Sequence, residues 1–561
     1  MNFSQLNHDA LLKGGCIAFS LATVGLLLVY VGYFSKSDFG SDDAVLNVLA
    51  GAGYEQGRLI VPRGWVTANS DIIFPSAALM MRAMLPWLPN GFTVHAIAAC
   101  ALTIVLLIAL AWGLVASGRS TLATTFVVTI LATGLSQGVL LMTFTQTTYF
   151  WWPFEFLTSA LIIQSYYRYT GTARKLSRPV LAGLLFAVNA TIAMTNPMRV
   201  LIMVVVPLLV FNRFASAGSA DVAQDSRASR ILRAVGPWTT LEINLALAVS
   251  IGAVGYYWTL YSLAVLRPEH ATFLRLANAA GWLEHLKIFA AGWFDYMGGT
   301  IDGYANNVLS AWVHVGYASL ALALSAVPLL ELRRWPAPME PARRAMIAAF
   351  FASFLPVFTM YILFDPLAQN YLTTRYFSVS VIILIVLCGW RVHDWLNRGG
   401  RARLGLLLLA TGCLALTTGY RLIPFEAGIP TPKSSSVMLL ADALRREGLV
   451  WGYATYWNAN SVSVLSDSLV RVSPIQLTTE RLMPYPVMIE KRWYNPNEHV
   501  GQSFLALTDD DLDPKKRALL TMRLGSPVRE FSVSAYHVMV YDRNISAAFD
   551  KPWKIPDSIE F

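Results

Sequence analysis

Charged residues are scarce in this sequence. Only 14% of its 561 residues are Asp, Glu, Lys or Arg, whereas 55% are hydrophobic. A soluble domain carries roughly 25% charged residues, so the composition excludes a chain that folds wholly in water. Uncharged apolar stretches of about 18 residues or more recur along the sequence, and each is long enough to cross the hydrocarbon core of a bilayer. We therefore expect a polytopic α-helical membrane protein.

Cysteine is also rare. The four cysteines, Cys16, Cys100, Cys388 and Cys413, all fall within expected membrane spans. The C-terminal region has none, which excludes a disulfide there whichever compartment it faces. No zinc-finger spacing and no basic face interleaved with aromatic residues occurs outside the spans. The net charge of +9 therefore does not indicate a nucleic-acid partner.

The apolar runs predict about eleven membrane-spanning helices. They cover residues 14–34, 93–117, 121–142, 150–168, 180–195, 197–212, 238–264, 306–332, 345–364, 376–392 and 404–424. Loops rich in Lys and Arg all fall on one side in this count, which makes that side cytoplasmic. We expect a multi-pass protein of the cytoplasmic (inner) membrane. Residues 1–425 would form its membrane domain, with an external first loop at 35–92.

The C-terminal region, residues 426–561, has the hydropathy of a soluble protein and is expected to form an external (periplasmic) α/β domain. Periodicity predicts helices at 434–447 and 513–523. Runs rich in β-branched and aromatic residues predict strands at 449–453, 461–465, 469–472, 503–507 and 536–541. The aromatic stretches 451–460 and 491–494 fit a domain core. Contact with a glycan, or packing over the first loop, is the alternative for both.

Two adjacent carboxylates, Asp42 and Asp43, lie a few residues after the first span. They precede an apolar run, 44–49, that can form a short helix in the membrane interface. Ser41 would cap such a helix, and aspartates in its first turn would favour the helix dipole. A capping role and a catalytic role are compatible, since a carboxylate at a helix start is fixed in space.

An acidic pair directly after the first span, within a long first external loop, resembles the GT-C superfamily of membrane glycosyltransferases, of the protein mannosyltransferase or aminoarabinose transferase type. The resemblance covers most of the chain in architecture and rests on short motifs at residue level. It implies transfer of a hexosyl or pentosyl group from a polyprenyl-phosphate donor to a cell-envelope glycan or lipid acceptor on the external face. Asp42 or Asp43 would be the general base of an inverting displacement. No cofactor is certain, and the pair does not decide whether a divalent metal takes part.

Such a reaction needs cations that stabilise the departing lipid phosphate. Arg375, which is followed by Tyr376, and Arg199 lie at the expected outer ends of spans, while Arg58 and Arg63 belong to the first loop. The planar fork of arginine binds two phosphate oxygens at once, so these residues are candidates for binding the donor phosphate. The alternatives are contact with lipid headgroups for the first pair and a plain surface role for the second.

A second external segment, between residues 267 and 307, mixes acids with aromatic rings. Trp293, Asp295 and Glu284 are its candidates for acceptor binding, because apolar sugar faces stack on rings. An interfacial aromatic belt would explain the rings equally well.

Two other functions compete with sugar transfer. An envelope lipid transporter or flippase would show an inverted repeat and matched broken helices, and the sequence indicates neither. His314 and Glu242 lie near or within spans but predict no proton relay. A polysaccharide polymerase or ligase would place its key residues in a long loop late in the chain, whereas the acidic pair here is early.

Overall fold

The structure of the chain is a computed structural model. The structure describes residues 3–59, 61–67, 71–72, 76–168, 171–217, 239–262, 276–299, 308–335, 339–365, 371–426, 429–430, 434–485 and 487–550. It separates into two compact units. Unit 1 comprises Met1–Tyr30, Cys100–Tyr256 and Thr272–Ile423, and unit 2 comprises Val31–Ala99, Tyr257–Ala271 and Pro424–Phe561. The first loop therefore belongs to the same compact unit as the C-terminal region.

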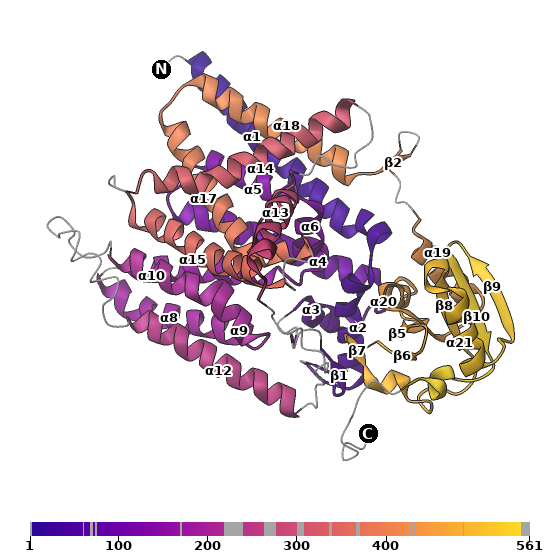
Figure 1. The fold of residues 1–561 in the computed structure, drawn as a ribbon. Coiled ribbons are helices and arrows are strands. Elements are labelled where there is room, and N and C mark those ends of the chain that lie inside the picture. The colour runs from indigo at the N-terminus through magenta and orange to yellow at the C-terminus, as the bar shows by residue number, and fades with distance from the viewer. Residues whose placement is uncertain are drawn as a thin grey trace. The chain divides into compact units, whose positions relative to one another are not determined.

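Unit 1 is helical. The helices that lie wholly or mostly in it are α1 (Phe3–Gly32), α4 (Phe92–Ala116), α5 (Thr121–Ala132), α6 (Gln137–Val139), η2 (Leu140–Thr145), α7 (Trp151–Arg168), α8 (Gly171–Ala193), α9 (Pro197–Val200), η3 (Leu201–Val205), α10 (Val206–Ala217), α12 (Thr240–Ser262), α13 (Ala279–Tyr296), α14 (Val308–Leu332), α15 (Pro341–Leu363), η5 (Tyr371–Phe377), α17 (Ser378–Asn397) and α18 (Arg401–Leu422). The helix α10 packs along α15, and α17 packs against α5 and α15 (Figure 1). Helix α17 is apolar around most of its circumference and largely buried, which suits a helix in the centre of a bundle.

Eight helices among the described residues are long and apolar enough to cross a membrane, which confirms a multi-pass protein. They are His8–Gly32, Phe92–Ala116, Pro197–Ser216, Thr240–Tyr261, Ala311–Leu332, Pro341–Leu363, Thr374–Asn397 and Arg401–Leu422. Two further predicted spans, 150–168 and 180–195, are helical but are not both long and apolar enough to be counted among the eight. Polar residues are spread through α7, and the apolar part of α8 covers only Ser177–Ala193. The predicted number of spans, about eleven, is therefore larger than the number of described helices, eight, that are long and apolar enough to cross a membrane.

The predicted span 121–142 is broken. Helices Thr121–Ala132 and Gln137–Thr145 meet at 88°, and a ninth span results if they are counted as one. Gly134 and Leu135 turn the chain at positive φ, 71° and 46°. Arg421 of α18 donates to the carbonyl oxygens of Thr133 (2.8 Å) and Leu135, which satisfies backbone acceptors that the break exposes. The bend corrects the expectation of one continuous span over 121–142. A transporter would be expected to show two broken helices at matched positions.

The first loop contributes four elements to unit 2: η1 (Phe34–Asp38), α2 (Ser41–Glu55), β1 (Trp65–Val66) and α3 (Ala77–Met84). The helix expected after the acidic pair is confirmed as α2. Most of it is buried, because it packs against α3 on one side and α20 (Tyr456–Leu465) on another.

The C-terminal region of unit 2 is an α/β fold, as predicted. Its remaining elements are β2 (Phe425–Glu426), β3 (Ile429–Pro430), α19 (Ser436–Arg446), β4 (Trp451–Thr455), β5 (Arg471–Leu477), β6 (Leu482–Pro484), β7 (Ile489–Glu490), η6 (Lys491–Tyr494), β8 (Ser503–Thr508), η7 (Asp509–Asp511), α21 (Pro514–Leu524), β9 (Arg529–Val533), β10 (Tyr536–Tyr541) and η8 (Ile545–Ala548). Six strands form one sheet in the order β6-β5-β4-β8-β10-β9, drawn in orange to yellow in Figure 1. Strand β4 is parallel to both neighbours, and the other pairs are antiparallel.

One predicted strand of this region is wrong. Residues 461–465 belong to the helix α20, which starts directly after β4. The β-branched residues Val462 and Val464 favour a strand locally, but the segment is buried between α2, α19 and β5. Burial on several faces suits a helix better than a half-exposed strand, so tertiary packing overrides the local propensity.

Strand β1 of the first loop pairs with β7 of the C-terminal region, antiparallel, with Trp65 opposite Glu490 and Val66 opposite Ile489. Trp65, Val66 and Ile489 are fully buried. This two-residue ladder joins the first loop and the C-terminal region within unit 2.

Candidate active site

The acidic pair lies in the first turn of α2, where the two carboxylates have different surroundings. Asp43 is 3% exposed, and its Oδ2 accepts a hydrogen bond from the backbone N–H of Gly40 at 2.9 Å. Gly40, rather than Ser41, is the N-cap residue. The Ser41 hydroxyl oxygen instead accepts from the backbone N–H of Asn460, at 3.2 Å. Asp43 therefore fixes the start of the helix, which corrects the predicted cap.

Asp42 is half-buried and is held by a residue of the C-terminal region. The Tyr456 hydroxyl donates to Asp42 Oδ1 at 2.5 Å. The Tyr456 ring stacks on Tyr485, with centroids 4.4 Å apart and planes 20° apart. Burial, and then the charge of Asp42, raise the pKa of Tyr456 well above its ordinary value, so this phenol stays protonated and remains a donor. The only sequence signal for Tyr456 was its place in the aromatic stretch 451–460.

Polar side chains also fix the middle of α2. The Asn47 amide donates to Asn90 Oδ1 (3.2 Å) and to the Gly91 carbonyl (3.1 Å), and Asn90 returns a hydrogen bond to the Asn47 carbonyl (2.9 Å). His95 Nδ1 lies 2.9 Å from Asn47 Oδ1. Asn47 is fully buried, so these bonds satisfy an amide that would otherwise be costly to bury. The result is a rigid support for the residues one helical turn earlier.

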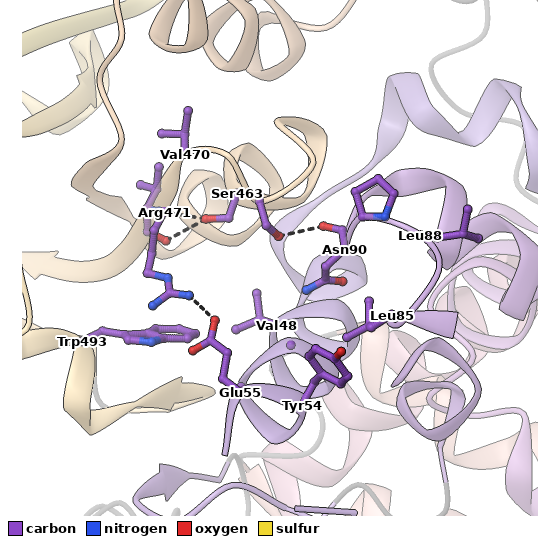
Figure 2. Close-up of a pocket in the computed structure, with 15 residues that line it drawn as sticks. Val48, Tyr54, Glu55, Leu85, Leu88, Asn90, Ser463, Val470, Arg471 and Trp493 are labelled. Carbon is purple, nitrogen blue, oxygen red and sulfur yellow. Dashed lines mark hydrogen bonds and ion pairs between the residues drawn. The ribbon is translucent and has the colours of Figure 1, made fainter. Parts of the chain in front are cut away.

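A charged cluster forms at the other end of α2. Glu55 accepts from Arg471 and, at 2.7 Å, from Arg492. Glu490 is fully buried, forms an ion pair with Arg492 at 2.8 Å, and accepts a hydrogen bond from the Gln56 amide at 2.7 Å. Burial raises the pKa of Glu490, and Arg492 and Gln56 offset part of that effect. Figure 2 shows Arg471 above the Trp493 ring as it reaches Glu55.

Unit 1 brings three of the predicted donor-phosphate residues together. Arg375 lies in η5, and Arg199 lies in the single turn α9. The guanidinium carbons of Arg375 and Arg199 lie 5.7 and 5.4 Å from the centroid of the Tyr376 ring. Arg375 also lies 5.3 Å from the Tyr149 ring. Two cations that share one aromatic ring repel each other, so this arrangement is suited to an anion that both can contact.

The surroundings of these arginines support an anion-binding role. In the part of the chain that the structure describes, the buried Nε of Arg375 has no hydrogen-bond partner and no carboxylate pairs with its guanidinium. The π-helical turns η2 and η3 lie just before Tyr149 and just after Arg199. Such π-turns are rare and often mark functional sites.

The other two candidate arginines, Arg58 and Arg63, belong to unit 2 and are placed by backbone contacts. The Arg58 N–H donates to the Gly53 carbonyl at 2.8 Å, and the Arg63 N–H donates to Gln56 Oε1 at 2.6 Å. Arg63 is exposed and Arg58 is half-buried. Their role in phosphate binding stays a prediction.

The three acceptor candidates lie on α13 in different environments. Trp293 packs in an aromatic cluster with Phe289 and Phe377, and its Nε1–H donates to Ser325 Oγ at 3.0 Å. Glu284 is exposed and pairs with Lys287 at 3.3 Å, whereas Asp295 is half-buried near the end of the helix. The structure gives Trp293 and Glu284 separate partners, and the acceptor role of all three stays a prediction. Of the same predicted segment, residues 267–275 and 300–307 lie outside the described residues.

Among the described residues, no group of three or more His, Cys, Asp or Glu side chains could hold a metal ion.

Similarity to known proteins is found at the level of structure and not of sequence. No protein-family model matches the chain, and no curated protein matches it. Among solved structures, the chain is similar to the crystal structure of ArnT from Cupriavidus metallidurans bound to undecaprenyl phosphate. The similarity covers 93% of this chain and 97% of that one, with 10% sequence identity and a TM-score of 0.48.

Proposed function

We propose that this protein is a membrane glycosyltransferase that moves a sugar from a polyprenyl-phosphate donor to a cell-envelope glycan or lipid on the external face of the membrane. The observation that supports it most directly is the convergence of Arg199 and Arg375 on the Tyr376 ring. Two guanidinium groups held this close suit a phosphate, whose oxygens can take hydrogen bonds from both. The acidic pair after the first span supplies the complementary base.

In the proposed reaction an acceptor hydroxyl oxygen attacks the anomeric carbon of the donor sugar. The bond between that carbon and the phosphate oxygen breaks, and the lipid phosphate leaves with the electron pair. The hydroxyl proton passes to an aspartate, and Arg199 and Arg375 stabilise the charge that grows on the phosphate. One displacement of this kind inverts the anomeric centre.

We assign the base to Asp42 and a positioning role to Asp43. Asp43 is 3% exposed and binds the backbone N–H that starts its own helix. Asp42 is half-buried, and Tyr456 holds one of its two oxygens. A general base must be fixed in orientation and still reach a substrate proton, and Asp42 meets both conditions better.

The proposal is tested in proteoliposomes of the purified full chain, supplied with polyprenyl-phosphate hexoses and an envelope lipid extract as acceptor. Wild type should form a new glycosidic bond with inverted configuration. Asp42→Asn should lower the rate by at least about a hundredfold, as expected for loss of a general base. Asp43→Asn should retain more activity but unfold at a lower temperature. Full activity in Asp42→Asn would refute the assignment, and no transfer by wild type from any donor would refute the function.

A further inference from the structure

Unit 2 contains a pocket that the reaction described above does not use. It has a volume of about 220 Å³ and lies between the second half of α2, the segment 85–90 and the C-terminal region (Figure 2). Roughly 150 Å³ is enough to hold benzene in an engineered protein cavity, so this pocket can hold one six-membered ring with its substituents. Its walls are mainly apolar with a few polar groups, which is the usual make-up of a small-ligand site.

The polar groups of the pocket are donors and acceptors of several kinds. Tyr54, Glu55, Asn90, Ser468 and Arg471 line it and supply a phenol, a carboxylate, an amide, a hydroxyl and a guanidinium. A ligand with many hydroxyl groups, each both donor and acceptor, fits such a mixture.

The cations beside the pocket are already paired with carboxylates. Glu55 binds Arg471 and Arg492, and Arg492 also pairs with Glu490, which is fully buried, and with Glu498 at 3.4 Å. A phosphate or another anion would have to compete with these carboxylates for the guanidinium groups. The paired cations therefore favour a neutral ligand over an anionic one.

One aromatic side chain of the lining is open to a ligand. Tyr54 is 46% exposed, although its neighbours Ala52 and Gly53 are buried. Among the described residues Tyr54 makes no ring contact and no side-chain hydrogen bond. An exposed ring beside hydrogen-bonding groups can pack against the apolar face of a sugar while those groups bind its hydroxyls.

We infer that this pocket binds one neutral pyranose residue of the acceptor glycan, and that Tyr54 is the residue against which the sugar packs. The acceptor role of the pocket rests on the proposed function. Sugar binding by the pocket does not rest on it and is measured separately.

Binding is tested on the detergent-purified full chain by saturation-transfer NMR. The probes are methyl pyranosides of glucose, galactose, mannose and N-acetylglucosamine, with inorganic phosphate as the anionic comparison. At least one glycoside should bind to wild type and to Tyr54→Phe, and Tyr54→Ala should weaken it about tenfold or more. The control Tyr33→Ala removes a tyrosine that is 55% exposed in the same unit and does not line the pocket, so it should bind as wild type does.

The transfer assay then separates the two proposals. If the pocket holds the acceptor, Tyr54→Ala should raise the acceptor KM about tenfold and leave kcat and the donor KM unchanged. Binding of no glycoside, equal loss in Tyr33→Ala, or phosphate bound in place of sugar would overturn the inference. Tyr54-dependent sugar binding without any transfer would instead overturn the proposed function and keep the sugar site. An unchanged acceptor KM in an active, sugar-binding enzyme would overturn the acceptor role.

Discussion

The hydrogen bond from Tyr456 to Asp42 gives the sharpest prediction for the candidate base. Tyr456→Phe removes one hydroxyl and keeps the ring that stacks on Tyr485. A hydrogen bond to a charged group contributes about 1.5–3 kcal/mol. Because Asp42 is half-buried, water can replace part of the lost bond, so we take the lower value. About 1.4 kcal/mol is a factor of ten in rate, and kcat should therefore fall roughly tenfold.

The assay is initial-rate transfer from a polyprenyl-phosphate sugar, with kcat and both KM values determined. Tyr456 holds the base without a predicted contact to either substrate, so the KM values should not change. The matched control is Tyr485→Phe, which removes the neighbouring hydroxyl and keeps the stacked ring; its kcat should stay within about twofold of wild type. An unchanged kcat in Tyr456→Phe, or an equal fall in the control, would show that this bond does not orient the base.

Four further changes test other parts of the structure. Arg375→Lys replaces a two-pronged donor by a point charge, so the Kd for sugar-free polyprenyl phosphate should rise about tenfold in a lipid-binding assay, while the exposed Arg333→Lys should not change it. Arg492→Ala leaves the carboxylate of Glu490 buried without its cation and should destabilise the full chain by about 3 kcal/mol, seen as a fall in Tm; an unchanged Tm would contradict the pairing. Burial raises the pKa of Glu490, so its contribution to stability is complete below the unfolded pKa of about 4.3 and is lost as pH rises through the higher native pKa. Because the glutamine of Glu490→Gln cannot ionise, the Tm of this variant should rise relative to that of wild type as pH increases from about 4.3 through the native pKa. Gly452→Ala places a Cβ 2.4 Å from an aromatic ring of β8 and should cost about 1–3 kcal/mol, and a wild-type Tm would refute the close packing.

The sequence predicted the membrane helices and four of the six strands of the main C-terminal sheet, because hydropathy and period are local signals. Strand β10 (Tyr536–Tyr541) was predicted with the correct ends, and the apolar run after the acidic pair gave α2. Two of the predicted spans, in α7 and α8, were not confirmed by length and apolar composition, because polar residues are spread through α7 and the apolar part of α8 is short. At the break between α5 and α6, backbone carbonyl oxygens accept hydrogen bonds from Arg421, which is remote in sequence and which local patterns cannot identify as a partner.

The candidate site was predicted only in part, for the same reason. Arg199, Arg375 and Tyr376 were chosen singly from their positions at helix ends, and the structure places them together. The contacts of Asp42 and Glu55 with the C-terminal region join residues more than 400 positions apart. No periodicity or spacing in one sequence reports such contacts, so Tyr456 could not be identified as a partner of the acidic pair.

The short ladder between β1 and β7 has a consequence for how this protein is made. The ribosome completes β1 long before it reaches β7, and hundreds of residues, with most of the membrane helices, are synthesised in between. Until the last part of the chain emerges, the early loop keeps Trp65 and much of α2 without their native cover, in the state most open to proteases and chaperones. A nascent chain that stalls before β7 emerges should therefore be degraded from its first external loop, even though the described membrane helices all precede β7.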